Sequence, residues 1–496
     1  MKTVDDRTLC LLYTTGRDVA GVVPADRELL RYDIWTNLAH AVMLSEMPPP
    51  VLSADEVTQI KSALNALDDA AADDAFAIDF GRPGAPGAVE DVHYYVENHV
   101  CEHAGDDAGR KLHTARSRND QVTTDLRLLV RDKIVYFADE VLALCGTLAE
   151  RAREHAAVVM PGYTHHQHGA VSSLGFLWAS HAEAFMRDVE RLGGVMTLAD
   201  RCPLGAVMSF GTSWPIDRAR TAALLGFSMV QVNSLDAVSS RGEIETSFVA
   251  ALSQLMNHLS ILAQDLLLMT TEEFGFLRVA DALTTGSSVM PQKHNLDFAE
   301  VTKAKASVVA GHLQAMLGIT RGNLSGYNRD AQWTKTSLLD AIRECMLAPR
   351  IFARAIATLT VDDEHERTML EQCRRGYLNA VDVADYLAAS KNVPFRTAHG
   401  VVKNAVDACR PNVPALTTER LNDALARAGL DARMTDAEVA SLSDPLENLK
   451  RRTSAGSPNP DETQRCVDRL ESEIKAQTVT WNETATRLRA ARDALR

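Results

Sequence analysis

Residues Asp120–Ala157 read DQVTTDLRLLVRDKIVYFADEVLALCGTLAERAREHAA, and this stretch decides the fold. Apolar side chains recur in it with a near-heptad rhythm, which predicts one continuous amphipathic helix. They are Val122, Leu126, Leu129, Ile134, Phe137, Val141, Leu144 and Leu148. At 1.5 Å per residue, roughly 35 helical residues would span on the order of 50 Å. A helix of that length in a soluble chain must be buried against other long helices.

Four further stretches have similar apolar patterns and predict long helices of the same kind. They are Ser172–Leu198, Ile244–Thr270, Val301–Ile319 and Thr336–Thr360. Five long helices in one region predict an all-α bundle, which we place at residues 116–362.

Residues 1–115 have the pattern of a small N-terminal helical domain. A helical rhythm begins at Arg27, and Ser53 has the character of an N-cap for a second helix. Residues 80–88 contain three glycines and two prolines, which predicts a loop, and Glu90–Glu102 follows as a short helix.

Residues 363–496 predict a third, small helical domain because the apolar stretches become shorter. Asp382–Ser390 and Thr397–Cys409 have the length of short helices. Leu442–Asp461 is polar and contains prolines and glycine, and Glu462–Ala476 follows as a charged helix.

The composition favours helices whose cores are built from Ala, Leu and Val, because 46% of residues are hydrophobic and only 5% are aromatic. The chain has 52 Lys and Arg against 66 Asp and Glu, a net charge of −14. This balance argues against nonspecific nucleic-acid binding, which needs basic surfaces. An anionic substrate would need cations placed locally in its site.

The eight cysteines form no Cys-x-x-Cys pair, so the sequence indicates neither a zinc ribbon nor a redox motif. We expect reduced thiols in a cytoplasmic protein. The N-terminal residues lack the apolar core of a signal peptide, and no apolar run approaches about 18 residues, so we expect no membrane span.

A polar loop interrupts the predicted bundle at residues 284–297, and its centre, residues 285–295, reads TGSSVMPQKHN. Gly and Pro exclude a regular helix there, and long apolar helices flank it. Ser288, Lys293, Asn295 and the backbone N–H groups suit a carboxylate or another oxyanion. The alternative is an ordinary surface connection between two helices.

This loop resembles the signature loop of the aspartase/fumarase superfamily, and its Met-Pro-Gln-Lys text is most similar to the argininosuccinate lyase branch. Other blocks resemble the family in the same order along the chain. They are Glu90–His93, Lys111–Val122, Pro161–Gln167, Pro203–Gly205 and Pro394–His399. The resemblance implies an all-α, three-domain fold with a long central helical bundle.

The resemblance also implies a carbon–nitrogen lyase that cleaves an N-substituted L-aspartate by β-elimination to fumarate and an amine. It implies no cofactor and no metal, so His166 and His168 are expected to be exposed or supporting residues rather than ligands. The enzyme must stabilise a doubly charged aci-carboxylate, for which cations and N–H donors are suited. Argininosuccinate, which would give arginine, is the default substrate.

From the residues alone, the obvious base is His165, oriented by Glu300 as in a catalytic triad. The resemblance instead matches Ser287 to the base, His165 and Glu300 to a supporting pair, and Lys293 to the group that stabilises the serine alkoxide. The residues that it matches to substrate binding are Ser117, Arg118, Asn119, Thr164, Ser288, Met290, Asn295, Asp297, Tyr327, Gln332 and Lys335.

Two departures from the family text concern the substrate, one in the segment that resembles the family's contact with the amine end and one in a segment that lies near the site in the family. Trp333 and Thr334 replace an acidic pair, and the segment Thr14–Asp18 lacks the usual tryptophan. A paralogue that acts on another aminodicarboxylic acid, such as ethylenediaminedisuccinate, is therefore an alternative. A non-catalytic, crystallin-like structural protein is an alternative of another class, and adenylosuccinate lyase fits the loop text less well.

The resemblance further implies a homotetramer whose central helices form a common core. Each site would then draw the Ser117 block, the His165 block and the Ser287 loop from different subunits.

Overall fold

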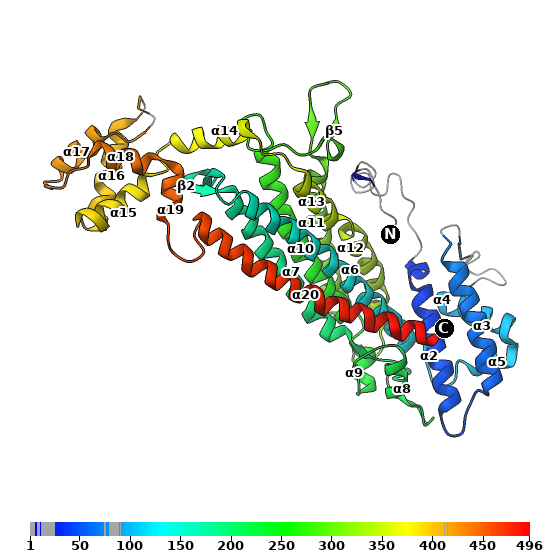
Figure 1. Cartoon of the computed structure of the whole chain (residues 1–496). Helices are drawn as coiled ribbons and strands as arrows, with labels where there is room; N and C mark the ends of the chain where they lie inside the picture. Colours follow the sequence, from blue (N-terminus) through cyan, green and yellow to red (C-terminus); the bar gives the residue numbers. More distant parts are fainter. Residues whose placement is uncertain are drawn as a thin grey trace.

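The computed structural model describes residues 5–6, 10, 25–73, 76–78, 89, 91–410, 412–413 and 415–496. These residues form an elongated, predominantly helical molecule, with a long bundle between two smaller helical parts (Figure 1). The expected all-α fold is confirmed. The loop predicted at residues 80–88, the residue Glu90 and the segment Thr14–Asp18 lie outside the described residues.

The predicted central helix is α6, which extends over 37 residues from Arg118 to Glu154. Its start is set by a capping box, in which the Asn119 N–H donates to Ser117 Oγ and the Ser117 N–H donates to the Asp120 carboxylate. The helix therefore begins within the Lys111–Val122 block, and the cap fixes the backbone of the block at Ser117.

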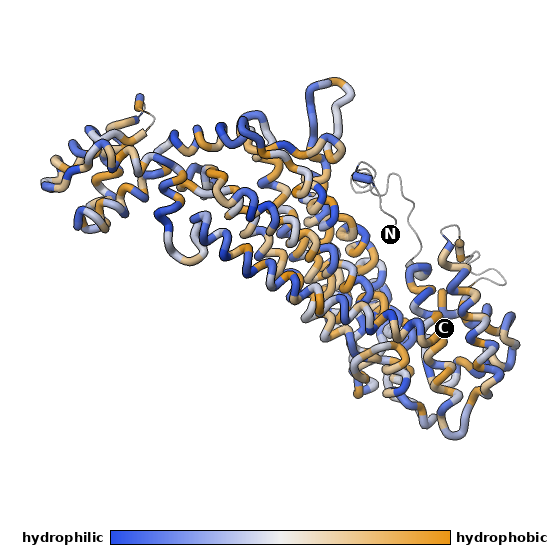
Figure 2. Tube along the Cα trace, in the orientation of Figure 1, coloured by the Kyte–Doolittle hydropathy of each residue, from blue (hydrophilic) through white to orange (hydrophobic). Residues whose placement is uncertain are grey.

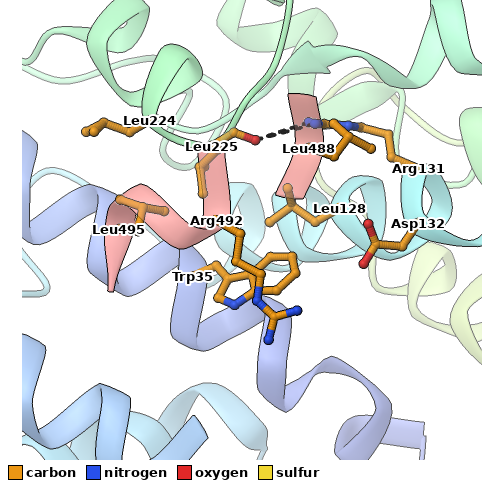
Figure 3. Close-up of a pocket in the computed structure, with 9 residues that line it drawn as sticks. All are labelled: Trp35, Leu128, Arg131, Asp132, Leu224, Leu225, Leu488, Arg492 and Leu495. Atoms are coloured by element: carbon orange, nitrogen blue, oxygen red, sulfur yellow. Dashed lines mark hydrogen bonds between the residues drawn. The ribbon is translucent and has the colours of Figure 1, made fainter. Parts of the chain in front are cut away.

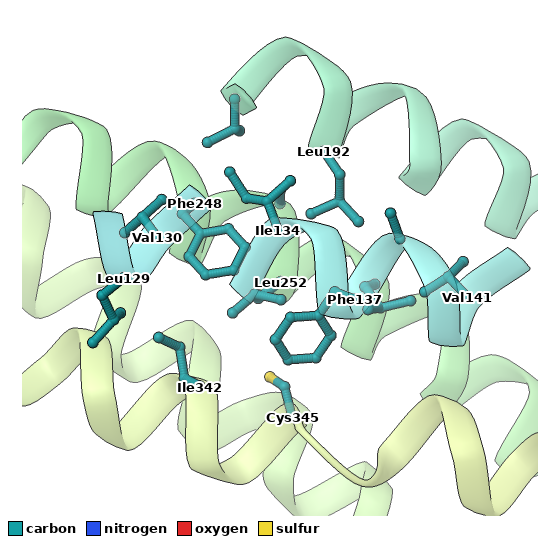
Figure 4. Packing of buried hydrophobic residues seen from close by; sticks show 14 of the residues in the cluster. Leu129, Val130, Ile134, Phe137, Val141, Leu192, Phe248, Leu252, Ile342 and Cys345 are labelled. Atoms are coloured by element: carbon teal, nitrogen blue, oxygen red, sulfur yellow. The ribbon is translucent and has the colours of Figure 1, made fainter. Parts of the chain in front are cut away.

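Three more long helices build the main core together with α6. They are α7 (Leu174–Ala199), α10 (Glu243–Met269) and α11 (Asp297–Ile319). The first two pack against α6, and the third, α11, packs against α10. Figure 4 shows Phe137 of α6 beside Leu252 and Cys345, and its ring meets Phe248 edge to face at a centroid distance of 6.0 Å. Burial of each large apolar side chain stabilises the bundle by about 1.5–3 kcal/mol.

The single helix predicted at Thr336–Thr360 is wrong, because the structure has two helices there. They are α12 (Gln332–Cys345) and α13 (Ala348–Thr358). Pro349 lies in the first turn of α13, where its missing N–H is tolerated, whereas the interior of one long helix would not accept it. The Met346 carbonyl at the junction accepts a hydrogen bond of 2.7 Å from the Tyr136 hydroxyl.

The N-terminal part packs against the start of α6 and consists of short helices. They are η2 (Ala25–Leu29), α2 (Leu30–Glu46), α3 (Ala54–Ala71), α4 (Val92–Ala104) and α5 (Asp106–Lys111). The predicted cap at Ser53 is confirmed, since its side chain and that of Glu56 form a reciprocal capping box.

Short elements lie at the two ends of the bundle (Figure 1). At the end near the N-terminal part are β3 (Arg201–Cys202), α8 (Arg218–Leu224), β4 (Met229–Val230), α9 (Ser234–Ser239) and η4 (Arg329–Ala331). At the opposite end are β1 (Val159–Thr164), β2 (Gln167–Ser173), η3 (Asp281–Leu283), β5 (Thr285–Gly286) and β6 (His294–Asn295).

A C-terminal lobe, which we define as α14–α19, extends beyond that opposite end (Figure 1). Its helices are α14 (Asp363–Arg374), α15 (Ala380–Lys391), α16 (Phe395–Cys409), α17 (Thr418–Arg427), α18 (Asp436–Ser443) and α19 (Pro445–Arg451). Residues of α15 to α18 share a separate apolar core. The proposed division into residues 1–115, 116–362 and 363–496 stays a prediction.

The last helix, α20 (Pro460–Leu495), has 36 residues and is longer than the predicted Glu462–Ala476. It returns along the outside of the bundle, and its tube in Figure 2 is largely hydrophilic, while apolar segments gather in the bundle. Its end packs on the N-terminal part, where the Arg492 guanidinium lies 4.1 Å from the Trp35 ring centroid (Figure 3). None of the described helices is both long and apolar enough to cross a membrane.

Candidate active site

The expected site residues lie at opposite ends of the bundle within one chain. Ser117, Arg118 and Asn119 lie at the N-terminal end of α6, and His165 follows its C-terminal end (Figure 1). The 37 residues of α6 at 1.5 Å each separate these ends by about 55 Å. A single chain therefore brings together only part of the predicted site at each end.

The Asp120 side chain joins the Ser117 block to the segment that contains Gly205 and Val207. It is buried, and its Oδ2 accepts the N–H groups of Gly205 and Val207, each at 2.8 Å. The pKa of this carboxyl is raised to about 6, because the effect of burial is larger than the opposing effect of its three backbone N–H donors. The Pro203–Gly205 block, which resembles the family, is thus fixed against the Ser117 block.

Two residues of the N-terminal part orient the Arg118 side chain. Its Nη1 donates to Asp91 Oδ2 at 3.1 Å, and its guanidinium lies 5.6 Å from the centroid of the Tyr94 ring. The side chain remains 37% exposed, so the guanidinium is accessible to an anion. Sequence reasoning named the Glu90–His93 block but missed the contact between Asp91 and Arg118.

A cavity of ≈160 Å³ lies at the same end of the bundle, between α9 and the segment that precedes α12. Its lining includes Arg241, a buried residue whose guanidinium lies 5.8 Å from the centroid of the Tyr327 ring. The Ser239 hydroxyl accepts the Gly326 N–H at 2.7 Å, which holds the segment bearing Tyr327 in place. A buried arginine at a polar cavity suits a carboxylate ligand.

The substituted pair Trp333-Thr334 divides into one exposed and one buried residue. Trp333 is 68% exposed in the first turn of α12, beside the exposed Gln332. Thr334 is fully buried, and its hydroxyl donates to the Ala331 carbonyl at 2.7 Å. The threonine therefore has a structural role. The side chains of Trp333 and of the half-buried Lys335 are accessible to solvent.

His165 lies at the tip of the β1–β2 hairpin. Thr164 pairs with Gln167, so His165 and His166 form a two-residue turn, with φ of 53° and 57°. Positive φ at both positions is the mark of a type I′ turn, which matches the twist of the strands. Thr164, His165, His166 and His168 are all exposed, and exposure agrees with the expectation for His166 and His168.

The signature loop is the tip of a second hairpin, in which Thr285 pairs with Asn295 and Gly286 with His294. Ser287 Oγ accepts the N–H of Met290 at 3.0 Å and that of Val289 at 3.3 Å. Two N–H donors on one hydroxyl oxygen favour its negatively charged form. The neighbouring Ser288, Met290 and Lys293 are exposed and can meet a ligand from outside the chain.

Two carboxylates follow the loop in the first turn of α11, where the helix dipole favours negative charge. Asp297 Oδ2 accepts the Thr285 hydroxyl, which ties the base of the hairpin to the helix. Glu300 is exposed, and within the described part of the chain it makes no hydrogen bond to His165. One chain therefore does not form the expected supporting pair.

A buried cluster with metal-ligand chemistry lies beside the Ser117 block and was missed from the sequence. Ligand atoms of Asp33, His93 and Asp125 all lie within 4.8 Å of one another. His93 Nδ1 is 2.8 Å from Asp33 Oδ1, and Gln121 also donates to Asp33. Burial raises the Asp33 pKa, but His93 and Arg116 more than offset this, so that the pKa is lowered overall. These contacts, beside the buried Arg116, make the cluster a hydrogen-bonded network of buried polar groups.

Comparison with known proteins identifies the class of this fold and site. Residues 25–311 match a family model described as Lyase, and residues 377–447 match one described as argininosuccinate lyase C-terminal. EDDS lyase in complex with formate has a TM-score of 0.87 at 23% identity, covering 99% of this chain and 94% of the other. Class II fumarase from Schistosoma mansoni has a TM-score of 0.69 at 13% identity, covering 89% and 94%. The chain is thus a lyase with the aspartase/fumarase fold.

Sequence relatives define the branch. Argininosuccinate lyase of Desulforamulus reducens is 37% identical over 461 residues, which cover 92% of this chain and 95% of the relative. That of Synechococcus sp. (strain JA-3-3Ab) is 41% identical over 434 residues, covering 87% and 84%. This chain belongs to the argininosuccinate lyase family, and it is a carbon–nitrogen lyase that acts on a small molecule.

Proposed function

We propose that this lyase cleaves argininosuccinate to arginine and fumarate. The observation that carries this proposal is the likeness to argininosuccinate lyases along 92% of the chain. The site supports it chemically, because the arginines at one end of the bundle and the donor-rich loop at the other suit a dicarboxylate.

Ser287 acts as the base in this proposal. Its alkoxide takes a proton from the carbon next to a substrate carboxylate, and the electron pair moves into that carboxylate to form an aci-carboxylate. The N–H groups of Val289 and Met290, together with Lys293, stabilise the alkoxide, and we assign Ser288 and Asn295 to the substrate carboxylates. Collapse of the aci-carboxylate forms the double bond of fumarate and breaks the carbon–nitrogen bond, and the leaving nitrogen takes up a proton.

We further propose a homotetramer with sites shared between subunits. The opposite ends of α6 are about 55 Å apart, so only another copy can bring a Ser117 end to a Ser287 loop. Apolar side chains on α10 and α11 support this arrangement, since Ile261, Val308 and Leu317 are 51%, 48% and 54% exposed. Such faces on central bundle helices suit packing against copies of the same helices.

We place the enzyme in the cytoplasm. All eight cysteines are free thiols among the described residues, and six of them are buried. A reducing compartment maintains this state.

The substrate is tested by fumarate release from argininosuccinate and a panel of N-substituted L-aspartates, including ethylenediaminedisuccinate. We expect argininosuccinate to have the highest kcat/KM, which the ultraviolet absorbance of fumarate would measure. Turnover of another panel member with none of argininosuccinate would contradict the substrate assignment and point to the exposed Trp333 as a specificity residue. Absence of fumarate from every substrate would favour the structural, crystallin-like alternative.

A further inference from the structure

The β1–β2 hairpin, which carries His165 at its tip, rests on the C-terminal lobe. Val159 and Val171 of the hairpin lie in an apolar cluster with Cys373, Leu378 and Leu449, which come from the lobe. Met160 and Tyr163 of the same hairpin pack on the main bundle core, so the hairpin is held by the bundle and also by lobe residues that follow it in the sequence by some two hundred residues or more.

Arg452, directly after α19, joins the lobe to the hairpin through four hydrogen bonds to two partners. Its Nη1 donates to the Val171 carbonyl of β2 at 2.6 Å. Its Nε and Nη2 each lie 3.2 Å from Asp382 Oδ1, and Nη2 lies 3.0 Å from Oδ2. Asp382 belongs to α15 and is 9% exposed. Because the planar guanidinium is fixed by the carboxylate fork, it holds the Val171 carbonyl in a defined direction.

The contact at Val171 is connected to the tip by paired backbone. Val171 pairs with Pro161, and the pairs Gly162–Ala170, Tyr163–His168 and Thr164–Gln167 follow toward the turn, with a shift of register between Gly162 and Tyr163. Further out, the Tyr163 hydroxyl lies 3.2 Å from His168 Nε2. A shift of β2 at Val171 is therefore transmitted along the strands to the turn at His165.

Gly376 of the lobe supports the same strand close to its tip. Its φ is +77°, and a Cβ at this position would lie 3.3 Å from Nδ1 of His168. The lobe thus approaches β2 at two points, one at Val171 and one at His168, and both contacts restrict the angle of the hairpin.

We propose that Arg452 is a positioning residue for the reaction, which sets the place of His165 by clamping the hairpin to the C-terminal lobe. This inference rests on the proposed function in so far as His165 supports the elimination. It also makes the lobe part of the catalytic apparatus, although the lobe contributes none of the predicted site residues.

The kinetic test compares Arg452→Ala and Arg452→Lys with a matched control, Arg451→Ala. Arg451 is the exposed neighbour, and its guanidinium contacts Ser441 of the lobe instead of the hairpin. We expect Arg452→Ala to lower kcat by about 10- to 100-fold with KM changed less than about threefold, since small misplacements near a reacting centre cost that much. Lysine can keep one of the contacts and should give an intermediate kcat, and Arg451→Ala should resemble the wild type.

A double variant separates positioning from general loosening. Because Arg452 acts through His165, Arg452→Ala should lower the residual kcat of His165→Asn by less than about twofold, as expected for residues that act as a unit. An undiminished loss in the His165→Asn background would overturn the proposal, as would a wild-type kcat of Arg452→Ala.

Hydrogen–deuterium exchange of the substrate-free protein provides a readout that does not depend on activity. Arg452→Ala should speed exchange of amides in residues 159–173 and leave the middle of α6 unchanged. Unchanged exchange in the hairpin, or equal acceleration in α6, would overturn the clamp. If the wild type released no fumarate from any substrate, the proposed function would fail while the exchange experiment still decided the clamp.

Discussion

The Ser287→Ala variant is expected to lose about 10³-fold in kcat for fumarate release, within the range that a positioned general base contributes. The physical reason is the environment of the hydroxyl. Its oxygen accepts the N–H groups of Val289 and Met290, which favour the alkoxide that must take the substrate proton. Removing one oxygen from a half-buried loop residue leaves the bundle core intact, so the melting temperature should stay within about 2 °C of the wild type.

The measurement is steady-state fumarate release with argininosuccinate, together with thermal unfolding of each variant. Ser390→Ala is a suitable control because Ser390 is an exposed serine near the end of α15 and is not one of the predicted site residues. Its kcat and melting temperature should match those of the wild type.

His165→Asn decides between the two candidate bases. If His165 supports the substrate and Ser287 removes the proton, both variants lose activity, and the loss in Ser287→Ala is at least as large. Should Ser287→Ala retain more than about a tenth of the wild-type kcat while His165→Asn loses about 10³-fold, then the histidine is the base.

Local rules predicted those parts of the fold that one residue pattern determines. The near-heptad rhythm placed α6, and the predicted cap at Ser53 explains why α3 begins where it does. The end of α20 was missed, since this helix is charged on most sides and packs on the bundle with few apolar residues such as Trp481. Tertiary contacts, which no local pattern records, stabilise its second half.

The candidate site was predicted as a set of residues but not as a geometry. The loop text located Ser287, yet the hydrogen bonds to its oxygen depend on backbone angles that close the turn. The contact of Asp91 with Arg118 joins residues 27 positions apart, and that of Arg452 with Val171 joins residues 281 apart. Such pairings depend on how helices pack, so a single sequence does not contain a direct signal for them.

The length of α6 leads to the second large effect, which is recovery of activity from two inactive proteins. Arg118→Ala removes a guanidinium at one end of the bundle, and Ser287→Ala removes the base at the other. Each variant alone should retain at most about 1% of the wild-type activity, since each lacks a group that contacts the substrate or its proton. In one chain these groups are too far apart to act on the same small molecule.

Mixing the two variants under conditions of subunit exchange should restore activity. A shared site is intact when its Arg118 comes from a Ser287→Ala subunit and its Ser287 comes from an Arg118→Ala subunit. Each condition has an even chance in an equal, random mixture, so about a quarter of the sites of a symmetric assembly should be intact. Fumarate release should therefore approach about a quarter of the wild-type rate, with an unchanged KM.

The ratio in which the two variants are mixed provides a control, because it sets the proportion of intact sites. Varying the ratio of the two proteins should give a maximum at equal amounts, because the product of the two chances falls on either side. Native mass spectrometry of variants with different tags would show that mixed tetramers form. If they form and activity stays at the level of the separate variants, each site belongs to one chain end alone, and the shared-site arrangement is wrong.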